Sequence, residues 1–248
     1  MATNIFLITS IIAVAITGGY YAYTQNIGNL QQTIVNRNRK SKAKLANEQM
    51  RIDPSAIRRK VVNNQYQNKR WQKLGNIVIP NLQISLPIYN QPYNQDALKI
   101  GAQQLKSVND QNIEIDNSMG NGNYILVAHN YNDGKSMFSA LQQYSNKDAP
   151  YFVNHKLGTN NWLNGAVIYL ANDQGVYQYT IDNQQTINED DLSVRKNNSQ
   201  ATLNIITCLF PSDTYRIDTQ AHLTKKWSWN STPNDVLKCL SQPYNLKR

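Results

Sequence analysis

TLNIITCLFPSDTYRIDTQAHL, residues 202–223, predicts two β-strands joined by a short loop. Apolar residues dominate 202–208, and apolar and polar residues alternate over 215–223, as in strands with one buried face. Pro211, Ser212 and Asp213 in the connection are typical of turns. A hairpin of this kind would bring Arg216 beside Cys208. The stretch therefore indicates a thiol and a guanidinium group at neighbouring strand ends.

A third reactive group ends another predicted strand. Residues 124–128 read YILVA, and His129 follows them. A cysteine acts as a nucleophile in its thiolate form, which needs a base or a positive neighbour. Cys208, His129 and Arg216 are therefore candidates for a nucleophile, a base and a positive neighbour. Taken singly, each has a structural alternative: a buried thiol, a histidine bonded to backbone and a surface arginine.

The rest of the chain from Gly75 onward also has the pattern of an all-β protein. Strand patterns with Pro and Asn breaks occur at 76–79, 82–88, 151–154, 166–170 and 176–181. Short helices are expected at 136–141 and 234–240. No internal repeat is present. About eight short strands separated by turn residues favour a closed β-barrel or a sandwich.

The order of these motifs resembles a class A sortase, a Gram-positive cell-surface transpeptidase, from Gly75 to Leu223. The resemblance lies in the opening strands at 75–80 and 82–89, Gly101-Ala102 before the next strand, Val127-Ala128-His129, the Phe-x-x-Leu at 138–141, Asn204-Ile205-Ile206-Thr207-Cys208, and Arg216 before an alternating strand. The resemblance implies a closed barrel of about eight strands. It also implies catalytic roles for His129, Cys208 and Arg216.

Several positions depart from the family pattern. Asn204 stands where the signature has its first Thr, and Ala128 stands where Gly usually precedes the histidine. Calcium-binding members carry acidic residues upstream of the histidine. Here Glu114 could serve, but Asn117 and Asn121 occupy positions where carboxylates are expected, and calcium prefers several charged oxygen ligands. We therefore expect no cofactor and no strong calcium requirement, with Asp110, Asp116 and 189–191 as a minor alternative.

The resemblance implies a substrate and a mechanism. Cys208 would attack the Thr carbonyl of an LPxTG-type sorting signal near the C-terminus of an exported protein, and release the Gly amine. The thioester would pass to an amine of a lipid-linked peptidoglycan precursor. We expect Thr207, Asn204 and Ala128 to line the substrate groove. His155, His222 and Cys239 are interpreted as bystanders.

An apolar segment precedes the predicted barrel. Residues 4–23 carry no charge, and a segment of this length is long enough to cross a bilayer. Tyr20, Tyr21 and Tyr23 lie at one end of it, where interfacial aromatic residues are expected. A cleaved signal peptide is the alternative; the Ala13-Val14-Ala15 run resembles a cleavage site, but no Lys or Arg precedes the segment. We therefore predict a transmembrane anchor at 1–23, a basic stalk at 24–70 in which Ile52, Ala56 and Ile57 could dock on the domain, a catalytic domain at 71–228 and a tail at 229–248.

Charge and composition limit the other function classes. The net charge is +9, and basic residues follow the apolar segment at 37–44 and 58–60. This placement favours lipid headgroups over nucleic acid, and no zinc-ligand spacing or RNP-like pattern is present. The positive-inside rule would place the chain that follows this apolar segment in the cytoplasm, but the rule weakens for long translocated domains. We therefore infer the orientation from the sortase-like chemistry of the domain, and predict a single-pass membrane protein with an extracellular catalytic domain.

Two other functions remain open from the residues. An L,D-transpeptidase also uses Cys and His, but Thr207-Cys208 lacks its preceding Gly and Arg216 lies too far from the thiol. A membrane-tethered β-domain that binds wall polymers without catalysis would need no activated Cys208. The two cysteines are too few for a secreted disulfide scaffold.

Overall fold

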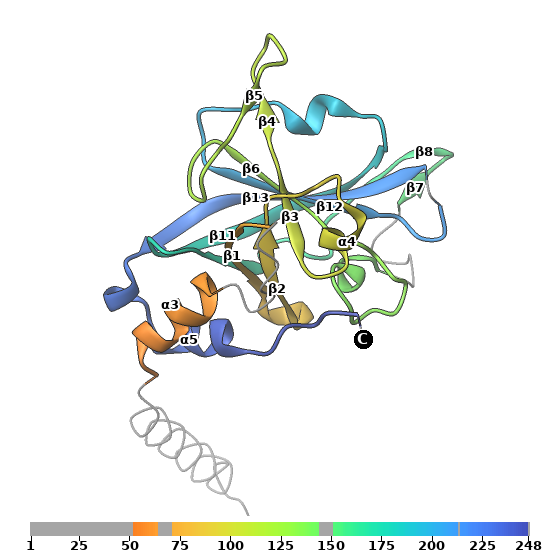
Figure 1. Ribbon diagram of the computed structural model, residues 1–248. Coiled ribbons are helices and arrows are strands. Elements are labelled where there is room, and N and C mark those ends of the chain that lie inside the picture. The colour runs from red at the N-terminus through yellow and green to blue at the C-terminus, as the bar shows by residue number, and fades with distance from the viewer. Residues whose placement is uncertain (1–51, 64–70, 144–150, 213, 248) are drawn as a thin grey trace, which may run out of the picture. The chain divides into compact units, whose positions relative to one another are not determined.

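Eight strands close into a barrel (Figure 1). A computed structural model describes residues 52–63, 71–143, 151–212 and 214–247. In spatial order the strands are β10 (Val167–Ala171), β1 (Lys73–Ile79), β2 (Ile84–Tyr89), β3 (Ala102–Leu105), β6 (Asn123–Val127), β12 (Thr202–Cys208), β13 (Tyr215–Trp227) and β11 (Val176–Asn188). Pairing of β10 with β11 completes the ring. The predicted all-β barrel is confirmed.

Two of the pairings are parallel, and one of them positions the site. β2 pairs with β3 and β6 pairs with β12 in parallel register, whereas the other neighbours in the ring are antiparallel. Ile206 lies opposite Val127 in the β6–β12 pair. The carboxyl ends of β6 and β12 therefore leave the barrel on the same side.

The barrel interior is filled by alternate side chains. Leu203, Ile205 and Thr207 of β12 are buried, and the intervening Ile206 and Cys208 are partly exposed. This period of two is the pattern that predicted the strand. Gly101 allows β2 and β3 to approach closely, since a Cβ there would lie 2.5 Å from the Pro87 carbonyl oxygen.

Several predicted elements differ in extent. The strands predicted over 176–181 and 215–223 continue to Asn188 and Trp227. Three other elements differ because of their local backbone conformation. Pro80–Leu82 form a 3₁₀ turn and Gln83 has φ 54°, so the strand predicted over 82–88 begins at Ile84. The helix predicted over 136–141 is a single 3₁₀ turn, η3 (Ser139–Leu141), because Met137 has φ 54° and cannot continue a helix. The strand predicted over 151–154 shrinks to β7 (Phe152–Val153), since Asn154 and His155 have positive φ and form the turn to β8 (Lys156–Leu157).

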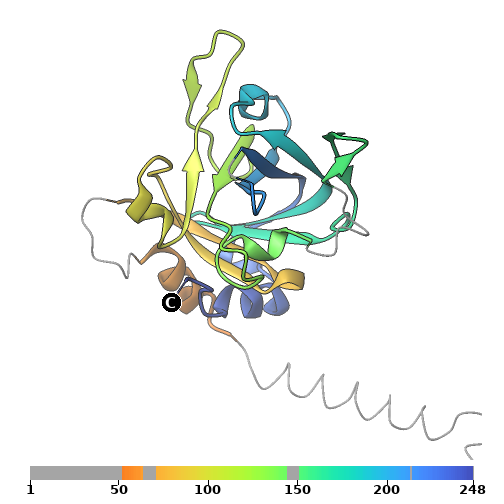
Figure 2. The same cartoon turned by 90° about the vertical axis from the view of Figure 1, so that its right-hand side faces the viewer.

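Several short elements were not predicted from the residue pattern. A hairpin of β4 (Ser107–Val108) and β5 (Glu114–Ile115) projects from the barrel in Figures 1 and 2. Helix α4 (Gln95–Leu98) follows β2, and β9 (Thr159–Asn160) adds to the edge of β11. The 3₁₀ turns η4 (Leu192–Arg195) and η5 (Trp229–Ser231) follow β11 and β13.

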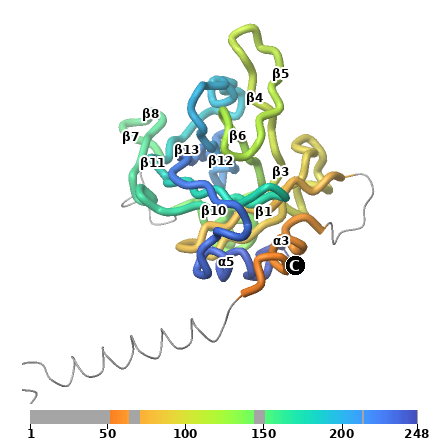
Figure 3. Tube along the Cα trace, turned by 90° about the vertical axis from the view of Figure 1, so that its left-hand side faces the viewer, coloured from red at the N-terminus to blue at the C-terminus, as the bar shows by residue number. Residues whose placement is uncertain are grey.

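Two helices pack side by side against the outside of β1 and β10 (Figure 3). Helix α3 (Pro54–Val62) begins at Asp53, whose side chain accepts a hydrogen bond from the Ser55 N–H, and it buries Ile57 and Val61. Helix α5 (Asn234–Ser241) buries Val236, Leu237 and Leu240. The second predicted helix is therefore present, and the compact unit that holds the barrel begins at Ile52.

The predicted transmembrane segment, residues 1–23, and the stalk up to residue 51 lie outside the described residues. Within the part of the chain that is described, no helix combines the length and apolar character of a membrane span.

Candidate active site

Three side chains meet where β6, β12 and β13 end. His129 follows β6 by two residues, Cys208 is the last residue of β12, and Arg216 is the second residue of β13. Cys208 and Arg216 lie directly opposite each other in the antiparallel ladder, so their side chains share one face. All three line one pocket of about 350 Å³. The structure therefore brings together the three groups that the sequence singled out.

The pocket lining combines apolar and polar side chains. Val127 and Ile206, from paired positions of β6 and β12, line it together with the three reactive groups. Pro92, Tyr93, Gln95 and Leu98 form one wall. A larger groove of about 770 Å³ shares Pro92 and Tyr93 with this pocket, but its lining contains no thiol and no imidazole. The chemistry therefore belongs to the smaller pocket.

The wall at 92–98 is held by side-chain amides. Asn94 caps α4 by accepting hydrogen bonds from the N–H groups of Asp96 and Ala97, each at 3.0 Å. The buried Gln103 donates to the carbonyl oxygens of Ala97 and Gly101 and accepts from the Gln91 N–H. Asn94 before a short polar segment is an N-cap signal that could have located α4 from the sequence.

His129 is a half-buried imidazole at this site. Burial, and after it the positive charge of Lys99, holds the pKa of His129 below its usual range. Its ring packs against Tyr131, with ring centroids 5.2 Å apart. A neutral imidazole beside a thiol can accept the thiol proton, which makes His129 suited to generate the nucleophile.

Arg216 is partly buried and paired with an acid. Its Nη2 donates to Oε2 of Glu189 at 2.7 Å, and its Nη1 donates to the carbonyl oxygen of Tyr215 at 3.0 Å. Glu189 directly follows β11, which pairs with β13. These bonds restrict the orientation of the Arg216 guanidinium group, and Arg216 lines the same pocket as Cys208.

Two amide side chains join the histidine and cysteine strands. Asn130 donates to the carbonyl oxygen of Cys208 at 2.9 Å and to Oε1 of Gln142 at 2.6 Å. Gln142 in turn donates to the Phe210 carbonyl at 2.8 Å and accepts from the Phe210 N–H at 3.0 Å. Asn130 and Gln142 therefore hold the backbone from Cys208 to Phe210, directly after the thiol. Neither residue was singled out from the sequence.

The residues predicted to line the substrate groove have different positions. Ala128 and Thr207 do line the pocket, and the buried Thr207 hydroxyl donates to the Ala128 carbonyl at 2.8 Å. This bond ties β12 to β6 immediately before the two reactive residues. Asn204 is not part of the pocket lining: its buried side chain donates to both carboxylate oxygens of Asp218, at 2.9 and 3.0 Å.

The candidate calcium ligand is engaged by two cations. Glu114 pairs with Arg195 at 3.2 Å and with Lys106 at 3.4 Å. The described residues contain no cluster of three or more acidic, histidine or cysteine side chains with the geometry of a metal site. Glu114 therefore links the β4–β5 hairpin to η4 through an ion pair.

A profile of the sortase domain matches residues 77–224, which is more than half of the chain. The chain belongs to the sortase family. Two curated relatives are named sortase A: one from Listeria monocytogenes, 27% identical over 141 residues that cover 57% of this chain and 51% of the relative, and one from Streptococcus agalactiae, 24% identical over 238 residues that cover 93% and 85%. The chain spans about half the length of the Listeria relative. Both names support the class A assignment.

Solved sortases have the same fold. Listeria monocytogenes sortase A superposes with a TM-score of 0.52 at 25% identity, covering 69% of this chain and 99% of that one. Sortase C-3 from Streptococcus pneumoniae gives a TM-score of 0.52 at 16% identity, with 90% and 97% covered. The residues that match the sortase domain begin inside β1 and end inside β13, so they include all or part of each of the eight barrel strands.

Proposed function

We propose that this sortase is a cysteine transpeptidase that cleaves an LPxTG-type sorting signal between Thr and Gly and transfers the acyl part to an amine of a lipid-linked peptidoglycan precursor. One observation carries the proposal: a thiol, an imidazole and a guanidinium group from three strand ends line a single pocket. Membership of a family of transpeptidases supports it.

The first half of the reaction forms a thioester. His129 takes the proton of Cys208, and the thiolate sulfur attacks the Thr carbonyl carbon. The carbonyl oxygen gains negative charge, which Arg216 stabilises from the position on β13 that is paired with Cys208. The C–N bond to Gly then breaks, and His129 gives its proton to the departing amine. The acyl group remains on Cys208.

The second half reverses these roles. An incoming amine attacks the thioester carbonyl carbon, His129 accepts a proton from the amine nitrogen, and the thiolate of Cys208 leaves. A pKa of His129 below its usual range favours the neutral imidazole that this step needs. Ala128 and Thr207 shape the pocket beside the thiol. Asn204 would influence substrate binding only indirectly, because it bonds to Asp218 and lies on the same strand as Cys208.

We further propose that the enzyme needs no calcium and works outside the cell on a single-pass anchor. The calcium proposal is supported by the ion pairs of Glu114 with Arg195 and Lys106, which already neutralise that carboxylate. The anchor proposed at 1–23 is supported by the uncharged apolar segment at 4–23. The stalk at 24–70, the catalytic domain at 71–228, the tail at 229–248 and the extracellular location stay predictions.

The test is mass spectrometry of the full chain in detergent, incubated with an LPxTG peptide and an amine. We expect a thioester adduct on Cys208 and a new amide product, both lost in Cys208→Ala and retained in Cys239→Ala. Arg216→Lys keeps the charge but loses the planar donor pair, and should lower the rate of adduct formation. A folded parent that forms neither adduct nor product would contradict the proposal and favour a wall-binding domain.

A further inference from the structure

The loop that follows His129 has an unusual backbone. Asn132, Gly134 and Met137 have φ of 55°, 64° and 54°. Gly and Asn tolerate this left-handed region, whereas the Met137 side chain disfavours it. The loop closes through a bridge between Asn130 and Met137, and the Phe138 N–H donates to the His129 carbonyl. A loop with this much left-handed backbone needs surrounding contacts to fix it.

Asp133 supplies part of this support from within the loop. Its Oδ1 accepts hydrogen bonds from the N–H groups of Lys135 and Ser136, at 2.9 and 2.8 Å. Burial opposes ionisation of this carboxyl, but these donors outweigh it, so the pKa of Asp133 lies well below its usual range. The carboxylate is therefore charged under all ordinary conditions.

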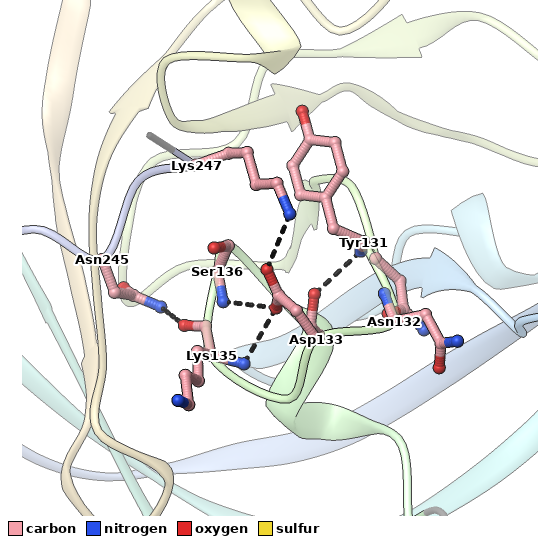
Figure 4. A network of polar contacts seen from close by, with 9 residues as sticks. Tyr131, Asn132, Asp133, Lys135, Ser136, Asn245 and Lys247 are labelled. Carbon is pink, nitrogen blue, oxygen red and sulfur yellow. Dashed lines mark hydrogen bonds and ion pairs between the residues drawn. The ribbon is translucent and has the colours of Figure 1, made fainter.

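Asn245, in the C-terminal segment, supplies the other contacts that hold this loop (Figure 4). Its side chain donates to the carbonyl oxygens of Lys135 at 2.7 Å and Met137 at 3.2 Å, and its own carbonyl accepts from the Met137 N–H at 2.9 Å. On the other side it bonds twice to Ser85 of β2, through its N–H at 3.0 Å and its Oδ1 at 2.7 Å. One residue thus fastens the loop after His129 to the barrel wall.

A second contact runs from the same segment toward the imidazole. Lys247 pairs with Asp133 at 3.1 Å, and its ammonium group lies 5.1 Å from the centre of the Tyr131 ring. Tyr131 packs against His129. The Lys247 side chain is 46% exposed, so this pair is the weaker contact and Asn245 the stronger one.

The His129 ring depends on this support. Within the described residues, no hydrogen bond to either ring nitrogen of His129 is present, and its ring contact is with Tyr131. Its orientation therefore follows from the backbone at 129–137 and from the position of Tyr131. Any movement of the loop would move the proton donor and acceptor relative to Cys208.

We propose that Asn245 is a positioning residue for His129, so that this one residue of the C-terminal segment helps to set the geometry of proton transfer. The inference rests on the proposed function for its kinetic consequence, but the orientation of the ring can be measured without turnover. Misplacing a catalytic group slows the chemical step more than it weakens substrate binding.

The experiment compares two neighbouring variants in the full chain. Asn245→Asp keeps the oxygen that accepts from Ser85 but loses both donors to the loop. Tyr244→Phe also loses two hydrogen bonds, between its hydroxyl and Asn76 and Lys73, which lie away from the loop. The measurements are the melting temperature, kcat and KM for the LPxTG peptide, and the NMR line widths of ¹³C-labelled histidine rings. His155 and His222 are internal references.

We expect Asn245→Asp to lower kcat about tenfold with little change in KM, and to broaden the His129 resonance alone. Tyr244→Phe should lower the melting temperature by a similar amount while leaving kcat and the His129 line unchanged. The proposal is overturned if Asn245→Asp keeps a sharp His129 line, or if both variants lose activity in proportion to their loss of stability. If the parent shows no turnover, the proposed function fails while the ring line widths still decide this inference.

Discussion

The side-chain amide of Asn130 donates a 2.9 Å hydrogen bond to the main-chain carbonyl of Cys208, so the residue after the candidate base holds the backbone of the candidate nucleophile. The same amide group donates to Gln142, which bonds both polar groups of the Phe210 backbone. The spacing of His129 and Cys208 therefore depends on two uncharged side chains that take no part in proton transfer.

Asn130→Asp should lower kcat/KM about 10- to 100-fold, because it removes both donors while keeping the oxygen that accepts from the Asn132 N–H. The measurement is the transpeptidation rate at saturating and limiting peptide. Asn198→Asp is the matched control, since Asn198 is exposed and bonds to Thr202 at the other end of β12. Equal losses in both variants would show that the effect comes from charge or stability rather than from the contact with Cys208.

Lys99→Gln should raise the pKa of His129 toward its ordinary value. A positive charge disfavours protonation of the imidazole, so its removal makes the imidazolium form more abundant at a given pH. The pKa can be followed by NMR titration of the His129 ring, and the limb of the pH–rate profile that belongs to His129 should move to higher pH. Lys225→Gln, an exposed change on β13, should leave both unchanged. A downward shift would refute the assigned cause.

Asn204→Thr, which installs the residue usual in the family signature, should destabilise the protein by about 1–3 kcal/mol at neutral pH, because Asp218 is fully buried and would lose two hydrogen bonds. Burial already raises the pKa of Asp218, against the donors Asn204, Gln185 and Gln220. A folded-state pKa above the unfolded one means that stability falls as pH rises through these two values.

The variant should raise the pKa of Asp218 further and extend that fall to higher pH. The free energy of unfolding, measured in urea at several pH values, tests this prediction. Asn198→Thr is the exposed control. A variant as stable as the parent across the pH range would show that Asp218 does not need Asn204.

Chelation should not slow the enzyme. The Glu114 carboxylate is already paired with Arg195 and Lys106, so the transpeptidation rate should be the same with a chelator and with added calcium. Arg195→Ala, assayed in the same two conditions, tests whether the ion pair between Arg195 and Glu114 is the reason that calcium has no effect. A strong stimulation of the parent by calcium would contradict the proposal that no metal is needed.

The barrel could be predicted from the sequence because its strands bury alternate side chains in one interior. β12 shows why: Leu203, Ile205 and Thr207 face inward, and the apolar run ends at the thiol. The four-residue helix α4 and the two-residue strand β9 are too short for a repeating burial pattern to be recognised in the sequence. The 3₁₀ turn at Ser139–Leu141 was predicted as a helix because composition does not report the positive φ of Met137.

The three reactive groups could be predicted because strand ends and family resemblance pointed to the same residues. The supporting residues could not. Asn130, Gln142 and Asn245 act through amide contacts between distant parts of the chain, and Asn and Gln are abundant on this protein's surface. Asn204 was expected at the substrate, but the position of its partner Asp218 follows only from the register of β12 and β13.

The parallel pairing of β6 with β12 also sets when the enzyme can become active. Thr207 bonds to a residue 79 positions earlier, so the ladder that carries the thiol forms only after a long segment has been closed into a loop. Closing such a long loop costs chain entropy before the contacts between its ends stabilise the fold, so these contacts form late in folding. In a partly synthesised or partly folded chain, His129 therefore lacks the candidate nucleophile beside it, and the candidate active site is complete only when the barrel closes.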